Sequence, residues 1–508
     1  MKMKMRKPLQ RFLMIALLGI GLAGSMGCGG TKEEAEQKEI AGAADLEGAR
    51  IGVQLGTTGD IYVSDYEGDE AGTTVERYNK GADAIQALKL GKIDCVVIDE
   101  QPGIEFVKQN SNIRIIDEEF SLEDYAFCVS KENTELLAQI NTAIEKLQAD
   151  GTIDNIIKNY IGTEEEIGAY PYVSKDVART NGTLIIGTNA EFPPYEYYEN
   201  NQITGIDMDI MRAVSDELGM DMQIEDMAFD SIIAAITSGK VNVGASGFTV
   251  TEDRKKNINF TDTYITTKQV IIVRDGGSTG GYSLKEKLYD NFVKDNRYLY
   301  IVKGFGNTLI ITLFAVMLGI ILGFLIAIVR TNHDRNGELP ILNAVCKVYL
   351  TVIRGTPVMI QLLIIYYVIL ASVTNKIVVA AIAFGLNSAA YVAEIVRSGI
   401  MSVDVGQFEA GRSLGLNYSQ TMQLIILPQA IKNILPALLN EVISLLKETS
   451  ISGYIGLMDL TKGGDIIRSN TYEAFLPLIA VAIIYLAFVM LLSTFVSKLE
   501  RRLRSSER

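Results

Sequence analysis

The chain has 508 residues, a formal net charge of −14, four cysteines and one histidine. Residues 1–30 carry five basic residues and no acidic one, residues 31–292 carry 23 basic and 48 acidic, and residues 293–508 carry 19 basic and 13 acidic. The basic residues flank apolar runs and form no patch, which argues against a nucleic-acid-binding protein. The cysteines have no metal-ligand spacing and His333 lies in a charged loop, so the sequence predicts no metal, no cofactor and no histidine-based catalysis.

Residues 1–30 have the pattern of an export segment. Their basic residues precede the apolar stretch 12–24, and small residues follow it. Cys28 is a candidate for lipid modification, as in bacterial lipoproteins, although Ser25 stands where that motif usually has leucine. Lipidation and simple cleavage both stay open. The polar residues 31–44 are expected to form a tether.

Residues 45–162 and 181–275 each alternate between strand and helix patterns, which predicts an α/β sheet protein. Residues 163–180 have the composition of a linker, and so do residues 276–294, which begin with GGSTGG. The expected strands include 50–55, 94–99, 241–246 and 269–274, and the expected helices include 82–90, 135–147, 207–218 and 230–238.

The last part of the chain is apolar enough to cross a membrane. Segments of about 20 apolar residues match the thickness of a bilayer core. The sequence predicts five spans, the odd number that places the basic loops and the C-terminal tail together on the inside. The expected spans are 307–329, 355–373, 377–393, 434–446 and 474–497.

One stretch between two of these spans has a fixed pattern. Residues 409–428 read EAGRSLGLNYSQTMQLIILP, with Glu409, Ala410, Gly411 and Gly415 near the start. This resembles the cytoplasmic EAA loop of ABC-importer permeases, where a short helix docks on the ATPase subunit; Gly411 replaces the second alanine. The resemblance implies a coupling loop near residues 404–428, whereas an ordinary polar loop is the alternative.

Three further runs resemble permeases of the polar amino-acid ABC-importer family: GNTLIITL from Gly306, RGTPVMIQL from Arg354 and NSAAYVAEIVRSGI from Asn387. The resemblance covers nearly all of residues 295–508 and implies an all-α, five-helix transmembrane permease domain. No G-x4-G-K-[ST] sequence occurs in the chain, so ATP hydrolysis is expected on a separate ATPase subunit, and the chain itself is not expected to be an enzyme. A homodimer is the simplest way to surround a pathway.

The α/β region resembles the amino-acid-binding protein of the same family, with its two parts in reverse order. The run TLIIGTNAEFPPYEYY at 183–198 is similar to the start of such a protein, and ARIGVQLGTTGD at 49–60 to its second part. This implies a two-lobe, type II periplasmic-binding-protein clamshell that is circularly permuted. The alternative is that residues 45–162 and 181–275 are relics of two separate domains.

The resemblance also implies a site for a free amino acid. Arg254 would clamp the carboxylate, with hydrogen bonds from Thr249 and Gly247, unless it is a surface arginine. Asp99 would pair with the ammonium, unless it caps a helix. The Gly/Thr turn at 56–59, with Thr57 and Thr58, could present N–H groups to an anion.

The rest of that site would surround the side chain of the ligand. Phe192 and Phe229 would flank it, although aromatic residues are more often core. Asn189 and Gln54 are neutral and fall where the family varies by substrate, which disfavours a strictly cationic ligand and suits a polar one such as glutamine.

The leading hypothesis is therefore a subunit of an amino-acid importer in the bacterial cell membrane, with its binding domain outside and its coupling loop and C-terminus inside. The alternative is a ligand-gated channel of the glutamate-receptor type, which uses similar clamshells. Such channels insert their pore within the binding domain and carry a filter loop, and this sequence shows neither.

Overall fold

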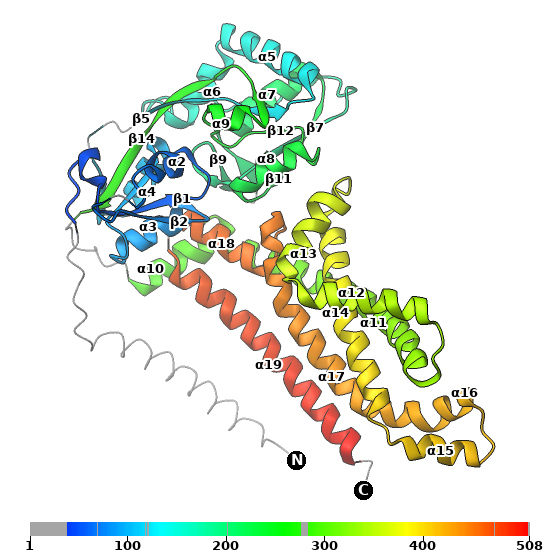
Figure 1. The fold of residues 1–508 in the computed structure, drawn as a ribbon. Helices are drawn as coiled ribbons and strands as arrows, with labels where there is room; N and C mark the ends of the chain where they lie inside the picture. The colour runs from blue at the N-terminus through cyan, green and yellow to red at the C-terminus, as the bar shows by residue number, and fades with distance from the viewer. Residues whose placement is uncertain are drawn as a thin grey trace.

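The computed structural model describes residues 38–68, 70–116, 118, 121–200, 202–275, 283–471 and 473–505. It contains two α/β lobes that rest against one end of a group of long helices (Figure 1). The predicted export segment with Cys28, most of the predicted tether and the GGSTGG joint lie outside the described residues.

Lobe A is built on a sheet in the order β2-β1-β3-β14-β4, and β5 also pairs with β14. Strands β1, β2 and β3 are parallel, and β14 runs antiparallel to β3. Its strands are β1 (Arg50–Gln54), β2 (Thr74–Tyr78), β3 (Cys95–Asp99), β4 (Ile113–Ile115), β5 (Ser121–Tyr125) and β14 (Ile265–Arg274). Its helices are η1 (Ala43–Leu46), α2 (Thr58–Ser64), α3 (Gly81–Lys89) and α4 (Glu100–Gln109).

Lobe B is built on a sheet in the order β11-β7-β12-β6-β13, with a small second sheet of β8, β9 and β10. Its strands are β6 (Cys128–Ser130), β7 (Thr183–Thr188), β8 (Glu191–Phe192), β9 (Glu196–Glu199), β10 (Gln202–Thr204), β11 (Asp221–Asp226), β12 (Val243–Gly244) and β13 (Ile258–Phe260). Its helices are α5 (Thr134–Ala149), α6 (Thr152–Ile161), α7 (Ile206–Leu218), η2 (Phe229–Ser231), α8 (Ile232–Thr237) and α9 (Glu252–Lys255).

Each lobe takes strands from both sides of the linker at residues 163–180. Strand β14 follows the linker yet pairs with β3, β4 and β5, and β6 precedes the linker yet lies between β12 and β13. The chain crosses between the lobes twice, from β5 to β6 and from β13 to β14. The two segments therefore share both sheets in this structure.

The linker itself is held against lobe B. The Asp216 carboxylate on α7 accepts hydrogen bonds from Tyr172 Oη (2.8 Å), Ser174 Oγ (2.9 Å) and the Lys175 backbone N–H (2.7 Å), and it pairs with Arg179. A buried carboxylate with this many donors fixes the path of the linker over the end of α7.

The remainder of the chain is helical. After the short elements α10 (Leu284–Leu288), η3 (Tyr289–Val293) and η4 (Lys294–Asn296) come the long helices and their connections. They are α11 (Tyr298–Asn336), α12 (Pro340–Gly355), α13 (Val358–Ile364), η5 (Ile365–Ile369), α14 (Lys376–Met401), α15 (Val405–Ser413), α16 (Tyr418–Thr421), η6 (Met422–Ile426), α17 (Leu427–Glu448), η7 (Thr449–Ile455), α18 (Leu460–Thr471) and α19 (Phe475–Ser505).

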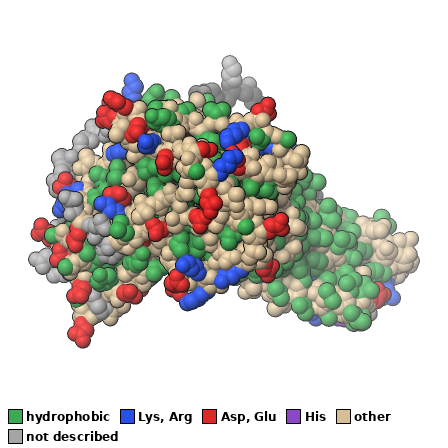
Figure 2. Space-filling model, turned by 90° about the horizontal axis from the view of Figure 1, so that it is seen from above, with side chains coloured by type: hydrophobic (Ala, Val, Ile, Leu, Met, Phe, Trp, Pro, Cys, Tyr) green, Lys and Arg blue, Asp and Glu red, His purple; other side chains and the backbone are tan. Residues whose placement is uncertain are grey.

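Four helical stretches of the described chain are long and apolar enough to cross a membrane, and a bent pair would make a fifth span. The four are 298–335, 376–401, 418–455 and 475–502. Hydrophobic side chains crowd this part of the surface, whereas charges of both signs are spread over the lobes (Figure 2). This contrast is the one expected between a lipid-facing region and a water-facing region.

The bent pair differs from the straight span expected at residues 355–373. Helix α12 ends at Gly355, and a new helix continues to Ile369 at an angle of 110°. Pro357 stands between them and cannot donate the hydrogen bond that would continue α12. Two smaller expectations also shift: β12 is two residues long, and the helix expected at 230–238 begins with the 3-10 turn η2.

Candidate functional site

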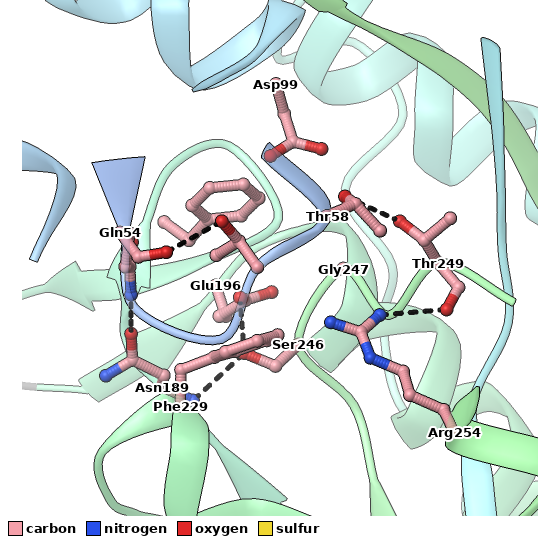
Figure 3. Close-up of a pocket in the computed structure, with 12 residues that line it drawn as sticks. Gln54, Thr58, Asp99, Asn189, Glu196, Phe229, Ser246, Gly247, Thr249 and Arg254 are labelled. Atoms are coloured by element: carbon pink, nitrogen blue, oxygen red, sulfur yellow. Dashed lines mark hydrogen bonds between the residues drawn. The ribbon is translucent and has the colours of Figure 1, made fainter. Parts of the chain in front are cut away.

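A nearly closed pocket lies between lobe A and lobe B (Figure 3), and the free space inside it is about 10 Å³, roughly the room that one water molecule needs. All ten residues that the sequence analysis assigns to the ligand line it: Gln54, Thr57, Thr58, Asp99, Asn189, Phe192, Phe229, Gly247, Thr249 and Arg254. Glu196 and Ser246 line it as well and were not predicted.

Arg254 reaches the pocket from α9, whose first turn is capped by Thr251. Its Nη1 donates to the Thr249 carbonyl oxygen (2.8 Å) and its Nη2 donates to the Gly56 carbonyl oxygen (2.9 Å). The side chain is buried beside the rings of Phe229 and Phe248, and burial lowers its pKa below the ordinary value. Among the ion pairs of the described residues, none involves this guanidinium, so it is a buried cation without a carboxylate.

Asp99 is the complementary group on lobe A, at the end of β3. It occupies the N-cap position directly before α4, but its side chain makes no capping hydrogen bond there. Its carboxylate accepts from the Tyr125 hydroxyl instead. Burial and the nearby Glu123 carboxylate raise the pKa of Asp99 to about 7. The helix-cap alternative therefore fails, and the part of the chain that is described offers Asp99 no ion pair.

The Gly/Thr turn behaves differently from the expectation. The Gly56 N–H donates to Asp60 Oδ2 (2.9 Å), so it is already used within the turn. Thr58 instead contributes its hydroxyl, which donates to Glu123 Oε2 (2.9 Å) and lies 3.3 Å from the Thr249 hydroxyl. The turn thus joins the two lobes through the Thr58 hydroxyl and through the Gly56 carbonyl oxygen, and less of its backbone N–H is free for an anion than the pattern predicts.

Direct contacts close the pocket on two further sides. Gln54 Nε2 of lobe A donates to Asn189 Oδ1 of lobe B (3.3 Å), and Asn189 Nδ2 donates to the Met227 carbonyl oxygen (3.0 Å). Phe229 stacks on Phe248 with ring centroids 4.9 Å apart, and Phe192 stacks on Tyr195 at 5.9 Å. The two lobes are therefore closed on each other, with neutral amides at one end of the pocket.

The two residues that the sequence analysis missed form one unit. Ser246 Oγ donates to Glu196 Oε1 (2.7 Å) and accepts from the Asn189 backbone N–H (3.1 Å). Glu196 Oε2 is buried without a partner among the described residues, and burial, reinforced by Asp207, raises the Glu196 pKa well above its ordinary range. Glu196 lies in the polar run EYYE, which is typical of an exposed strand, so no simple pattern indicated its burial.

The predicted coupling loop forms the short helix α15 at the end of the molecule far from the lobes (Figure 1). Asp404 caps it by accepting from the Gly406 N–H (2.7 Å), and Glu409 and Ala410 are exposed on its surface. Gly411 is buried, and a Cβ atom there would lie 2.6 Å from Thr421 Cγ2. The glycine that departs from the EAA pattern is therefore required by tight packing between α15 and α16. Gly415 ends the segment with φ +83°.

A two-lobed α/β unit with a closed polar pocket, joined to helices of membrane-crossing length, defines a membrane protein with a solute-binding module. Residues 184–456 match the family model of bacterial extracellular solute-binding proteins, family 3. The chain is 42% identical over 210 residues to the putative glutamine transport system permease protein GlnP of Rickettsia bellii, which covers 41% of this chain and 94% of that protein. It is 38% identical over 212 residues to the arginine transport system permease protein ArtQ of Bacillus subtilis, with 41% and 94% covered.

A solved structure described as an amino acid ABC transporter with histidines is 39% identical in sequence. The match covers 44% of this chain and 100% of the chain in that structure, with a TM-score of 0.39. Because the chain is 42% and 38% identical to GlnP and ArtQ over 94% of each protein, it belongs to the permease family of amino-acid ABC importers, and it carries a family 3 solute-binding region.

Proposed function

We propose that this chain is the membrane subunit of an ATP-driven ABC importer that captures an amino acid between its own two lobes and passes it to its own permease helices. The observation that carries this proposal is the pocket, in which a buried guanidinium (Arg254) and a buried carboxyl group (Asp99) both lack an ion-pair partner among the described residues. A free amino acid brings the two missing charges, a carboxylate and an ammonium.

The ligand class follows from the other end of the pocket. Gln54 and Asn189 are neutral amides that hydrogen-bond to each other, so they can exchange that bond for bonds to a polar side chain. We therefore assign a polar amino acid such as glutamine. A glutamate-receptor-type channel is less well supported, because the chain belongs to a permease family and carries a helix of coupling-loop pattern.

In this proposal residues 45–162 and 181–275 make one circularly permuted binding domain, and residues 295–508 make the permease after a joint at 276–294. The shared sheets support it, since β1 and β14 both flank β3 and a short connection from residue 275 to residue 45 would restore the family order. Residues 307–329, 377–393, 434–446 and 474–497 would lie in four spans, and the bent pair around Pro357 would supply the fifth.

The assembly would be a homodimer with a separate ATPase subunit bound at α15, because two permease units are needed around one pathway. The lobes would lie outside the bacterial cell membrane. The loop 404–428 and the basic C-terminus would lie inside, as the distribution of basic residues favours.

The ligand can be identified by thermal-shift measurements on the full chain in nanodiscs, with each of the common L-amino acids in turn. We expect a stabilisation by polar, uncharged amino acids, since a ligand that binds the folded protein alone raises its melting temperature. A panel in which no amino acid stabilises the protein would contradict the proposal.

Affinity for that amino acid should fall as the pH drops below about 7. Burial raises the pKa of Asp99 to about 7, and the ionised form is the one that pairs with an ammonium. Binding therefore releases a proton at low pH, and the affinity should fall by up to about tenfold per pH unit below 7 while levelling off above it.

Calorimetry in buffers of different ionisation enthalpy would measure both the affinity and the released proton. Asp99→Asn is the control, because it keeps Glu196 and Asp207, whose pKa values burial also raises, and so retains any pH dependence that belongs to them. Equal affinity of the unaltered protein at about pH 5.5 and about pH 8 would contradict the role of Asp99.

The permutation has its own test in the full chain. Exchanging the order of residues 45–162 and 181–275, with flexible joints, should preserve binding of the same amino acid, since the strands can pair as before. Loss of binding in a reordered chain whose membrane helices remain folded would show that the order matters and would argue against a simple permutation.

A further inference from the structure

A chain of buried ion pairs joins both lobes to helix α18 of the permease. Lys462 Nζ on α18 lies 2.9 Å from Glu191 Oε1 and 3.0 Å from Asp226 Oδ2, both on lobe B. Lys80 of lobe A lies 2.8 Å from the same Glu191 oxygen. A single carboxylate therefore receives one ammonium from the opposite lobe and one from the permease. Burial opposes the ionisation of Glu191, but these two ammonium groups lower its pKa to about 2.

The series of ion pairs continues along α18. Lys80 also approaches Asp465 (3.4 Å), which pairs with Arg468 (3.1 Å), and Arg468 Nη1 lies 2.5 Å from Asp83 Oδ1 on α3 of lobe A. Lys462, Asp465 and Arg468 are three residues apart and so share one face of α18. We call these seven residues the junction: Lys80, Asp83, Glu191, Asp226, Lys462, Asp465 and Arg468.

Lobe B has additional anchors on the permease. Lys376 of α14 pairs with Glu225 (2.7 Å), and Lys240 donates to the Val373 carbonyl oxygen (2.6 Å). Lobe A differs, because within the described part of the chain both of its ion pairs to the permease, from Lys80 and Asp83, go to α18. Lobe B is thus anchored on several elements of the permease, whereas the ion pairs of lobe A with the permease depend on its position relative to α18.

Helix α18 is packed against two of the membrane-length helices. The Leu460 N–H donates to Thr308 Oγ1 of α11 (3.1 Å). A Cβ atom on Gly463 would lie 2.5 Å from the Tyr300 carbonyl oxygen of α11, and one on Gly464 would lie 2.5 Å from Val481 Cγ2 of α19. The backbone of α18 therefore approaches α11 and α19 so closely that a side chain would not fit between them, which leaves α18 little freedom to move without these helices.

The junction also borders a second cavity, which adjoins the ligand pocket. This cavity, lined by Lys80, Glu191 and Lys462 together with Met359 and Leu363 of α13, shares Asn189 and Phe229 with the ligand pocket. The charged side chains of the junction therefore border the space between the pocket and the permease helices.

We propose that α18 senses closure of the two lobes through Asp465 and Arg468, and that the complete junction stabilises the closed lobes on the permease. Rotation of lobe A about the two connections between the lobes would withdraw Lys80 from Glu191 and Asp83 from Arg468 together, because Lys80 directly precedes α3 and Asp83 lies in its first turn. A rigid α18 held by Lys462 on lobe B cannot follow. This inference rests on the proposed function, in which lobe closure on an amino acid precedes transport.

The test is a measurement of the distance between the lobes in the full chain in nanodiscs. Spin labels are placed at Lys92→Cys on lobe A and Glu145→Cys on lobe B, two exposed sites, after the native cysteines are replaced by alanine. Electron paramagnetic resonance then gives the fraction of closed lobes as L-glutamine is added. Arg468→Met on the permease, Asp83→Asn on the lobe and their combination are compared with Lys303→Met, an exposed lysine of α11 that serves as the matched control.

We expect Arg468→Met and Asp83→Asn each to raise the L-glutamine concentration at half closure by about fivefold or more, the lower range of coupling between linked sites. Lys303→Met should stay within about twofold of the unaltered chain, and the double variant should resemble the single ones, since both changes break one interaction. A midpoint unchanged in Arg468→Met, or effects that add in the double variant, would overturn the proposal.

Failure of the proposed function would be visible separately. If L-glutamine fails to close the lobes in the variants, in the control and in the unaltered chain, the ligand assignment is wrong. The distances between the spin labels without ligand then decide the role of α18. In that case Arg468→Met and Asp83→Asn must still increase the ligand-free separation of the lobes relative to Lys303→Met, and equal separations would overturn the inference. Melting temperatures close to that of the control verify that each variant is folded.

Discussion

Replacing Arg254 by alanine should weaken amino-acid binding by at least about 30-fold, or about 2 kcal/mol. The guanidinium is buried, held by the Thr249 and Gly56 carbonyl oxygens, and has no carboxylate partner among the described residues. A charged hydrogen bond contributes about 1.5–3 kcal/mol net, and removing the cation leaves the ligand carboxylate unpaired in a desolvated site. Calorimetry on the full chain in nanodiscs would measure the loss.

Two further variants separate the role of the Arg254 guanidinium from the effect of charge alone and from the effect of altering α9. Arg254→Lys keeps the charge but not the planar fork, so its affinity should lie between those of the unaltered chain and Arg254→Ala. Lys255→Ala removes an exposed neighbour on the same helix, whose partner is Glu252, and should change little. Asp99→Ala should weaken binding as strongly as Arg254→Ala. Affinity within about twofold of the unaltered chain in either alanine variant would mean that its role is misassigned.

The second large effect is expected at α15. Gly415→Val should uncouple ATP hydrolysis by the partner subunit from the amino acid, because Gly415 has φ +83° and a β-branched residue there is strained by about 1–2 kcal/mol. Gly411→Val should act in the same direction, since its Cβ atom would collide with Thr421. Both changes displace the helix that is proposed to dock on the ATPase.

The measurement is ligand-stimulated ATP hydrolysis in proteoliposomes that contain this chain and its ATPase. Amino-acid binding, measured in the same samples, should be unaffected because α15 lies far from the lobes (Figure 1). Glu409→Arg tests the exposed face of α15, and Glu338→Arg, an exposed glutamate in the loop after α11, is its matched control. Stimulation that persists unchanged in Gly415→Val and Glu409→Arg would remove the coupling role from this loop.

Much of the site could be predicted because its residues lie in short local runs with defined chemistry. TVTEDR carries Arg254, CVVID carries Asp99 and GTTGD carries Thr57 and Thr58, and each run ends a strand or begins a helix as its composition predicts. Such runs bring their side chains to the same edges of two sheets, so the pocket forms wherever the sheets form.

The junction could not be predicted from the sequence. Lys462 and Glu191 are 271 residues apart, and neither lies in a run that indicates a partner. The pairing depends on how the lobes rest on α18. This polar helix lies between α17 and α19, and the hydropathy pattern does not predict it. Glu196 was missed for a related reason, since its burial follows from the small sheet of β8, β9 and β10 and not from its own polar run. The bend at Pro357 was missed because apolar composition alone does not show where a span breaks.

ATP-driven uptake by the smallest complete system tests the central claim most directly. Proteoliposomes would contain this chain and its ATPase, with no separate binding protein, and would be supplied with the radiolabelled amino acid that the thermal-shift panel identifies. The account predicts saturable accumulation that requires ATP inside and that Arg254→Ala abolishes. Uptake that appears only after a separate binding protein is added, or an ion current gated by the amino acid without ATP, would contradict it.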